Sequence, residues 1–334
     1  MMIKQILLVS VFSGILTILS VRNASATIPF DSVEPNITQI DTVIKIDANA
    51  ALGFNFPYYV RIPKGLDQNQ IQYLLVETNN TGVNDTLMFH EKGAYLEIIR
   101  NSLGSSICRK LKIPFLVPVF PRPAKEWKIY THAFDRDAAT IKTGDMRRLD
   151  LQLIAMTENA KTVLKRYGIQ LRDKFLMNGF SASGAFANRF TLIHPTLVAG
   201  TACGGVNAMP ILSIDQLGET KLKYPIGTSD FEQLFAVKFD MKEYQKVPQF
   251  IYMGQNDKND AVVFDDGYSK SERKVIFNLL GKVMIPDRFD KCKAIYAQNH
   301  VNSTFTVFPG IGHETDKQVF YGVIDFFTKI IDSK

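Results

Sequence analysis

The chain has few of the residues that mark disulfide-rich or nucleic-acid-binding proteins. Its 334 residues include three cysteines, and its basic residues form no run. Three cysteines are too few for a disulfide scaffold, although an oxidising compartment would allow one bridge and leave one thiol over. The formal net charge of +6 includes Lys4 and Arg22 of the N-terminal segment, so nothing indicates a nucleic-acid partner. The sequence does not specify a pairing among Cys108, Cys203 and Cys292.

Motifs for metal ions and cofactors are also missing. No spacing of His, Cys, Asp and Glu resembles a metal site, and we expect neither a metal nor a cofactor. The chain shows no internal repeat and no Pro/Gly/Ser-rich linker. Its hydrophobic content of 46% is ample for a large core and argues against disorder. A single domain over residues 27–334 is the simplest organisation.

Long apolar runs are absent except at the N-terminus. There Lys4 precedes an apolar segment, and a polar stretch then ends at Ala24-Ser25-Ala26, the A-x-A pattern of a signal-peptidase site. Residues 1–26 are therefore predicted to be a cleaved signal peptide, which makes the mature protein secreted or periplasmic. An uncleaved membrane anchor is the alternative, but the run is shorter than the ~20 residues that span a bilayer. No membrane span is expected after cleavage.

From residue 58 onward, short apolar runs alternate with segments of helical periodicity. This alternation is typical of an α/β protein with a mostly parallel central sheet and helices on both faces. Residues 147–168, for example, place apolar side chains three and four positions apart and end at Gly168. Residues 206–245 fit the alternation poorly and are expected to form a cap-like excursion over the sheet. The predicted strands cover residues 58–62, 73–76, 113–120, 174–180, 197–202, 249–254 and 303–309.

The stretch "NGFSASGAFANRF" (178–190) joins one of these strands to a predicted helix. Ser181 stands at the junction, with the small residues Gly179 and Ser183 two positions before and after it. A nucleophile on such a corner is held in a strained conformation with its hydroxyl exposed, and the close approach of strand and helix requires small neighbours. Ser181 is preferred to Ser183 as the nucleophile because only Ser181 has a glycine two residues earlier.

A serine nucleophile needs a histidine and a carboxylate from other strand ends. Asp257 follows the strand "QFIYMG", and His313 follows "FTVFP" within the segment "PGIGH". The order along the chain is therefore Ser, Asp, His. Asp260 is an alternative acid, because it precedes apolar residues, but Asp257 lies at the more suitable distance from its strand end.

Together these residues resemble the α/β-hydrolase fold serine esterases over about residues 45–330. The extracellular branch, with polyhydroxyalkanoate-depolymerase-like and cutinase-like enzymes, is the most similar. Ser183 departs from the pattern, since the family usually has glycine there. The resemblance implies an oxyanion hole formed by the backbone N–H of Ala182 and that of Asn79 or Asn80, although the usual His-Gly-Gly segment is absent.

The remaining histidines are given structural roles. His194 is expected to cap the end of the helix that follows Ser181. His132 is expected to belong to a structural hydrogen-bond cluster, and the alternative is that it lines the pocket. His90 and His300 follow no strand and are expected at the surface.

The sequence thus predicts an exported hydrolase that cleaves a carboxylic ester, small or polymeric, through Ser181, His313 and Asp257. The same residues would serve a peptidase or an acyltransferase. A protein of this fold that binds a ligand without turnover is a further alternative, because fold alone does not determine function.

Overall fold

A nine-stranded sheet forms the centre of the computed structural model, which describes residues 18–20, 37–100 and 102–333. The strand order is β1-β2-β3-β5-β4-β6-β7-β10-β11. β3 pairs antiparallel with both β2 and β5, and the other neighbouring strands pair in parallel. Each of the seven predicted strands is present, with ends shifted by at most a few residues. The strands are β1 (Ile18–Ser20), β2 (Thr42–Ile46), β3 (Tyr58–Ile62), β4 (Leu75–Val76), β5 (Phe115–Pro118), β6 (Phe175–Phe180), β7 (Val198–Gly204), β10 (Gln249–Gly254) and β11 (Ser303–Phe308).

Strand β1 falls inside the segment predicted to be a signal peptide. It pairs in parallel with β2 at the edge of the sheet. The rest of residues 1–26, including the predicted cleavage site after Ala26, lies outside the described residues. No helix in the described part of the chain is long and apolar enough to cross a membrane.

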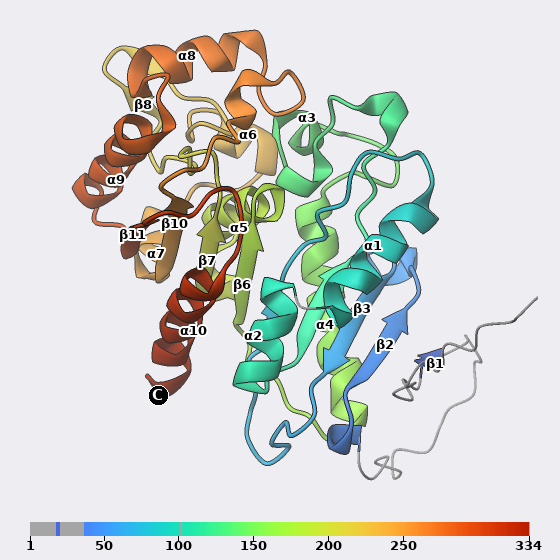
Figure 1. Cartoon of the computed structure of the whole chain (residues 1–334). Helices are drawn as coiled ribbons and strands as arrows, with labels where there is room; N and C mark the ends of the chain where they lie inside the picture. Colours follow the sequence, from blue (N-terminus) through green and yellow to red (C-terminus); the bar gives the residue numbers. More distant parts are fainter. Residues whose placement is uncertain (1–17, 21–36, 101, 334) are drawn as a thin grey trace, which may run out of the picture.

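Helices cover both faces of the sheet, as the sequence predicts. One face carries α1 (Leu87–Ile99), α2 (Leu103–Leu111) and α10 (Lys317–Asp332), which share a hydrophobic cluster with the sheet and lie in front of it in Figure 1. The opposite face carries α4 (Leu149–Arg166), α5 (Ala182–Ile193) and α9 (Phe289–Gln298), most of whose buried apolar side chains belong to a second, larger cluster. In α4 the buried residues Leu149, Leu153, Met156, Ala160 and Leu164 form the predicted stripe.

Residues 206–245 carry a two-stranded hairpin and two short helices instead of the sheet's alternating pattern. They comprise β8 (Gln216–Leu217), β9 (Thr220–Lys221), α6 (Phe231–Phe235) and α7 (Met241–Lys246). Several side chains of this excursion, among them Leu212, Leu222, Tyr224 and Phe235, are buried in the larger core cluster. Apolar burial of this extent is the main reason such an irregular segment keeps one conformation.

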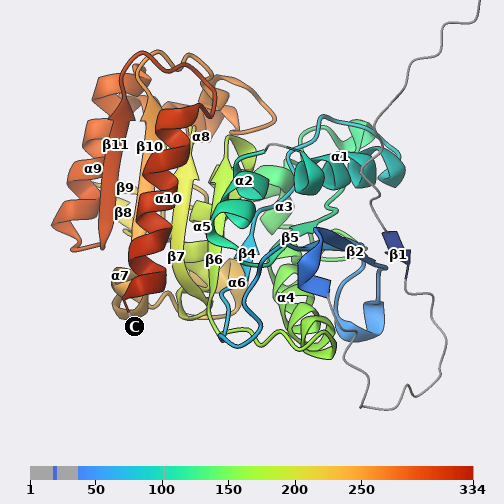
Figure 2. The same ribbon diagram turned by 60° about the horizontal axis from the view of Figure 1, so that its bottom comes forward.

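Helix α8 (Lys270–Leu280) lies with α9 at the end of the molecule that carries β10 and β11, as Figure 2 shows. The short helix α3 (Arg136–Ala139) lies away from this end, near α1 in Figure 1. α8 begins with a capping box, in which the Ser269 hydroxyl accepts from the backbone N–H of Glu272 and the Glu272 carboxylate accepts from that of Ser269. Single helical turns lie at Ile37–Gln39, Ala50–Leu52, Ala124–Glu126, Thr131–Ala133, Pro195–Leu197, Ala261–Val263 and Met284–Arg288.

The three cysteines are free and buried, so the one disulfide that the sequence allows does not form. Cys108 lies in the cluster beneath α2, whereas Cys203 and Cys292 lie in the larger cluster on the opposite face. Burial raises the pKa of each thiol to about 12. The thiols therefore behave as small apolar groups of the core.

Candidate active site

Ser181 lies on a strained corner between β6 and α5. Its backbone angles are φ 61 and ψ −123, a conformation that residues with a side chain rarely adopt. Strain of this kind costs about 1–3 kcal/mol and persists only where the surroundings enforce it. Here the backbone N–H of Ser181 donates to the carbonyl of Gly204 in the neighbouring strand at 2.9 Å. The serine is thus held half-exposed at the carboxyl end of the sheet.

The small residues on either side of Ser181 have distinct roles. A Cβ at Gly179 would lie 2.3 Å from the carbonyl oxygen of Ser183, so only glycine fits there. The Ser183 hydroxyl donates to the carbonyl of Phe180 at 2.9 Å and accepts from its N–H at 3.0 Å. The hydroxyl of Ser183 is thus directed back to the end of β6, while that of Ser181 makes no such contact.

The structure brings Asp257 and His313 together from the ends of neighbouring strands. Nδ1 of His313 lies 2.8 Å from Oδ2 of Asp257, whose side chain is fully buried. The other carboxylate oxygen accepts from the backbone N–H of Asn259 at 2.8 Å. With both oxygens engaged, the carboxylate fixes one orientation of the imidazole, which points Nε2 away from Asp257.

The His313 ring lies against the residues that flank the serine corner. Its centroid is 4.8 Å from that of Phe180, the residue directly before Ser181. A Cβ at Gly205, next to the carbonyl that anchors Ser181, would lie 3.0 Å from Cε1 of His313. Ser181, His313 and Asp257 therefore gather at one edge of the sheet, although no hydrogen bond joins Ser181 to His313 in the described contacts.

Asp260, the alternative acid, is directed away from His313. Its carboxylate accepts two hydrogen bonds from Arg288, both of 2.9 Å, and the Arg288 side chain is fully buried. It also caps the turn that follows by accepting from the N–H of Val262 at 3.1 Å. This arrangement anchors the loop that carries Asp257 and leaves no carboxylate oxygen of Asp260 near the imidazole.

Asn259 is a site residue that sequence reasoning missed. Its side-chain nitrogen Nδ2 lies 3.0 Å from Nε2 of His313, the ring nitrogen on the side away from Asp257. An amide nitrogen can only donate, so the imidazole accepts at Nε2 and carries its proton on Nδ1, facing Asp257. No motif marks Asn259, because its contact arises from the fold of the 255–260 loop.

Backbone N–H groups are available near Ser181. Ala182 is the first residue of α5, and the first N–H groups of a helix have no acceptor within the helix. Asn79 and Asn80 follow β4, which pairs directly with β6. Asn79 is buried, and its side chain bonds both the N–H and the carbonyl of Phe120 at 2.9 Å, whereas Asn80 is exposed. The side chain of Asn79 thus ties the loop after β4 to the segment after β5.

The other histidines have structural surroundings. His132 is fully buried with Nε2 2.9 Å from the carbonyl of Phe120, and burial lowers its pKa to about 3. His194 ends α5 and pairs with Asp150 at 2.9 Å. The prediction of a surface position for His90 is wrong: it is fully buried, 2.6 Å from the Thr81 hydroxyl. Its ring nitrogens contact Thr81 and Asn84 in the loop before α1 and the backbone N–H of Arg122, and sequence periodicity does not reveal these contacts. Among the described residues no cluster of His, Cys, Asp and Glu could hold a metal ion.

Two solved structures with a similar fold are named as a hydrolase and a depolymerase. A poly(aspartic acid) hydrolase from Sphingomonas sp. KT-1 matches with a TM-score of 0.54 at 13% identity, covering 87% of this chain and 98% of that chain. A poly(3-hydroxybutyrate) depolymerase from Bordetella parapertussis matches with a TM-score of 0.51 at 13% identity, covering 86% of this chain and 89% of that chain. No family profile and no curated protein sequence matches. The chain has the predicted α/β-hydrolase fold, with a mostly parallel sheet and helices on both faces.

Proposed function

We propose that this chain is an exported serine hydrolase that cleaves a carboxylic ester through an acyl-enzyme intermediate. The observation that carries the proposal is the strained Ser181 corner beside the His313–Asp257 pair, whose Nδ1–Oδ2 distance is 2.8 Å. A strained serine at a strand–helix corner and an imidazole fixed by a buried carboxylate are the parts that nucleophilic catalysis needs.

In the proposed mechanism His313 accepts the proton of Ser181 through Nε2 while the serine oxygen attacks the ester carbonyl. Asp257 keeps the imidazole in the required tautomer and stabilises the imidazolium that forms. The N–H of Ala182, with that of Asn79 or Asn80, holds the developing oxyanion. His313 then protonates the leaving alcohol, and a water molecule activated by the same histidine releases the carboxylic acid.

The resemblance to extracellular esterases and the predicted signal peptide favour an exported enzyme. The second structural relative is named for depolymerising poly(3-hydroxybutyrate), and a polymeric ester therefore belongs among the substrates to test. An amide substrate or a second acceptor alcohol would use the same three residues, so the ester bond is the part of the proposal that needs a direct comparison.

Two measurements test the proposal together. A fluorophosphonate should label the wild-type protein and not Ser181→Ala, and mass analysis should locate the label on Ser181. A series of p-nitrophenyl esters of increasing chain length should then be hydrolysed, with an amide of the same acyl group turned over far more slowly. Absence of labelling would favour a binding protein of this fold, and faster cleavage of the amide would indicate a peptidase.

A further inference from the structure

Strand β4 is in contact with β6, the strand before Ser181, over a short distance. Their register ends where Val76 lies opposite Met177. The next residue, Glu77, donates its backbone N–H to the carbonyl of Leu116 in β5 at 3.1 Å. Among the described contacts, no backbone hydrogen bond joins residues 77–80 to β6. The loop that follows β4 is therefore not held to β6 by the sheet itself.

A side-chain hydrogen bond continues this contact beyond the end of β4. Nδ2 of Asn178 in β6 donates to Oε2 of Glu77 at 2.6 Å. Glu77 follows Val76 and Asn178 follows Met177, so the pair stands where the next register pair of the two strands would be. Both side chains are buried. Among the described contacts, this is the one hydrogen bond between the 77–80 loop and β6.

Helix α2 closes over the carboxyl group of Glu77. A Cβ at Gly104, near the start of α2, would lie 2.2 Å from Oε2 of Glu77 and 2.6 Å from the ring of Phe115. Only a glycine at this position leaves room for the carboxyl group. The side chain of Glu77 is thus confined between α2 and Asn178.

Each partner is close along the chain to a group that the proposed mechanism uses. Asn178 is three residues before Ser181, on a strand that pairs with β7 up to its last residue. Glu77 is two residues before Asn79, whose backbone N–H is a candidate oxyanion donor. The side chain of Asn79 bonds Phe120, which follows β5 on the other side of β4. The Glu77–Asn178 bond is therefore the direct link from this loop to the strand that carries Ser181.

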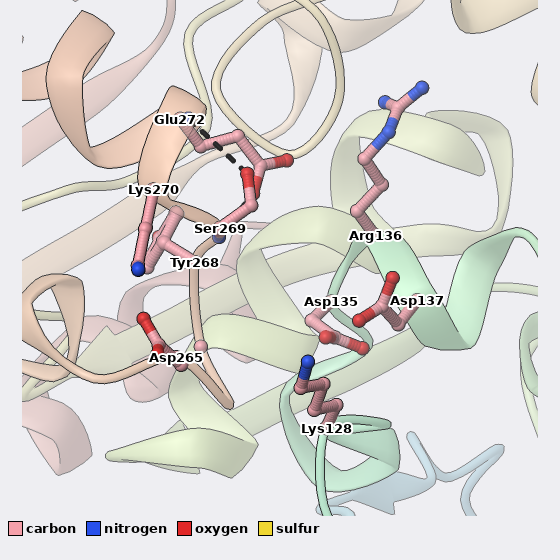
Figure 3. Close-up of a pocket in the computed structure, with 10 residues that line it drawn as sticks. Lys128, Asp135, Arg136, Asp137, Asp265, Tyr268, Ser269, Lys270 and Glu272 are labelled. Atoms are coloured by element: carbon pink, nitrogen blue, oxygen red, sulfur yellow. Dashed lines mark hydrogen bonds between the residues drawn. The ribbon is translucent and has the colours of Figure 1, made fainter.

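Burial alone does not distinguish Glu77, because Asp135 is also a buried carboxyl group. Asp135 lies at the wall of a cavity of about 270 Å³, which Figure 3 shows between residues 128–137 and 265–272. Its Oδ1 accepts from the backbone N–H of Tyr130 at 3.1 Å and from that of Ala138 at 2.9 Å. Both partners belong to its own segment, so Asp135 joins no two strands.

The Glu77–Asn178 pair lowers stability where it lies. Oδ1 of Asn178 has no hydrogen-bond partner among the described residues, and Leu75 and Leu176 beside the pair belong to an apolar cluster. A buried polar atom without a partner is unfavourable, whereas two apolar side chains of the same shape would not be. Local choices that stability does not favour are expected at functional sites.

We infer that Glu77 and Asn178 are positioning residues of the proposed active site. Their hydrogen bond fixes the 77–80 loop relative to the Ser181 corner and thereby places the second oxyanion donor. A donor held in position before the reaction stabilises the transition state without reorganisation. The inference rests on the proposed function, because it assigns the pair a role in that reaction.

Single substitutions that break the hydrogen bond test the inference. Asn178→Leu and Glu77→Met remove it with side chains of similar shape. Turnover (kcat) of a p-nitrophenyl ester should fall about tenfold to hundredfold, since the oxyanion donor is displaced. KM should stay within about twofold, because the contact forms in the transition state. The rate of fluorophosphonate labelling should fall together with kcat.

Glu77→Gln is the conservative variant and should keep the wild-type kcat at pH 7. Its amide oxygen can accept from Asn178 as the carboxyl group does. Burial raises the pKa of Glu77 to about 8, so the carboxyl group is mostly neutral at pH 7, like the amide.

The double variant, Glu77→Met with Asn178→Leu, separates position from stability. Each single variant leaves one buried polar partner unpaired and should unfold at a lower urea concentration than the wild type. The double variant replaces both partners, so its urea midpoint should return to that of the wild type. Its kcat should nevertheless stay low, because the 77–80 loop is still not tied to β6.

Gln249→Leu is the matched control. Gln249 is likewise a buried amide in the sheet, with one side-chain partner, Tyr244 at 3.2 Å, and one amide atom without a partner. It is the first residue of β10 and therefore lies at the opposite edge of the sheet from the proposed site. This variant should lower the urea midpoint and leave kcat and the labelling rate unchanged.

Wild-type kcat in Asn178→Leu, or recovery of kcat together with stability in the double variant, would overturn the inference. Either result would leave the proposed function standing as long as the wild-type protein is labelled at Ser181. Absence of labelling in the wild type would instead overturn the proposed function, and the positioning role with it. If Asn178→Leu does not fold, the double variant decides.

Discussion

The side-chain amide of Asn259 lies 3.0 Å from Nε2 of His313, the nitrogen that accepts the proton of Ser181 in the proposed mechanism. The amide and the serine hydroxyl therefore compete for one lone pair. Asn259 contributes in a second way that does not involve its side chain, because its backbone N–H donates to Asp257 at 2.8 Å. A substitution that keeps the backbone separates these two contributions.

Asn259→Ala should raise the rate at which a fluorophosphonate labels Ser181. Loss of a competing hydrogen bond worth about 1 kcal/mol corresponds to about a fivefold increase. Asn256→Ala, in the same loop and also exposed, is the matched control and should label at the wild-type rate. Slower labelling of Asn259→Ala would mean that the amide holds His313 in its productive position.

Ser181 and Ser183 should respond differently to substitution. Ser181→Ala should lower turnover by several powers of ten and leave the residual catalysis that the oxyanion donors supply. Ser183→Gly should keep the nucleophile but lose the two contacts with Phe180, at a cost of about 1 kcal/mol in the free energy of unfolding. Steady-state kinetics and urea unfolding of both variants check this, and reversed effects would move the nucleophile to Ser183.

Substitution of the two carboxylates of the 255–260 loop should have different effects, one on turnover and the other on the free energy of unfolding. Asp257→Asn should keep the fold and reduce turnover by roughly 10⁴, as for the comparable aspartate of the chymotrypsin triad in which the wrong tautomer is favoured. Asp260→Asn should instead lower the free energy of unfolding by about 3 kcal/mol, because it leaves the buried Arg288 charge without its partner. Full activity of Asp257→Asn with an inactive, stable Asp260→Asn would transfer the acid role to Asp260.

The buried Glu77 should make stability depend on pH. Burial and the nearby charge of Glu97 raise its pKa to about 8, although Asn178 donates to it at 2.6 Å. The folded state therefore binds this proton more tightly than the unfolded chain, whose glutamate titrates near 4.5. The stabilising contribution is complete below that value and is lost as the pH rises through about 8, with a slope of at most about 1.4 kcal/mol per pH unit.

Glu77→Gln removes this titration and tests it. Urea unfolding across the pH range should show wild type losing stability relative to Glu77→Gln as the pH rises from about 4.5 to about 8. Glu126→Gln, at an exposed turn, is the control and should parallel the wild type. A constant difference between wild type and Glu77→Gln would contradict the raised pKa.

The proposed export can be tested by identifying the first residue of the mature protein. If the signal peptide is removed after Ala26, mass spectrometry of protein recovered from the periplasm or medium should find Thr27 as the first residue. Retention of Met1 in exported protein would exclude this cleavage without affecting the fold.

The sequence predicts the sheet well, because a buried parallel strand is a short apolar run with a clear beginning and end. The strand 249–254 is such a run. The corner at Ser181 is recognisable because small residues stand between an apolar run and a helix. No local sequence pattern predicts that β5 lies between β3 and β4, because strand pairing depends on packing between distant segments. Asn259 and the burial of His90 escape sequence reasoning for the same reason: their partners are brought near by loops.

Arg288 anchors the 255–260 loop, which carries Asp257, to a distant part of the chain. Its guanidinium donates to Asp260, to the carbonyl of Asn207 at 3.1 Å and to those of Gly281 and Lys282 at 3.2 and 3.1 Å. Three separate segments thus meet on one cation. A chimera that exchanged residues 281–288 for the connection of another protein of this fold would keep every proposed catalytic residue and still release the loop that positions Asp257. The sheet edge with the proposed catalytic residues and this remote turn therefore have to be transplanted together.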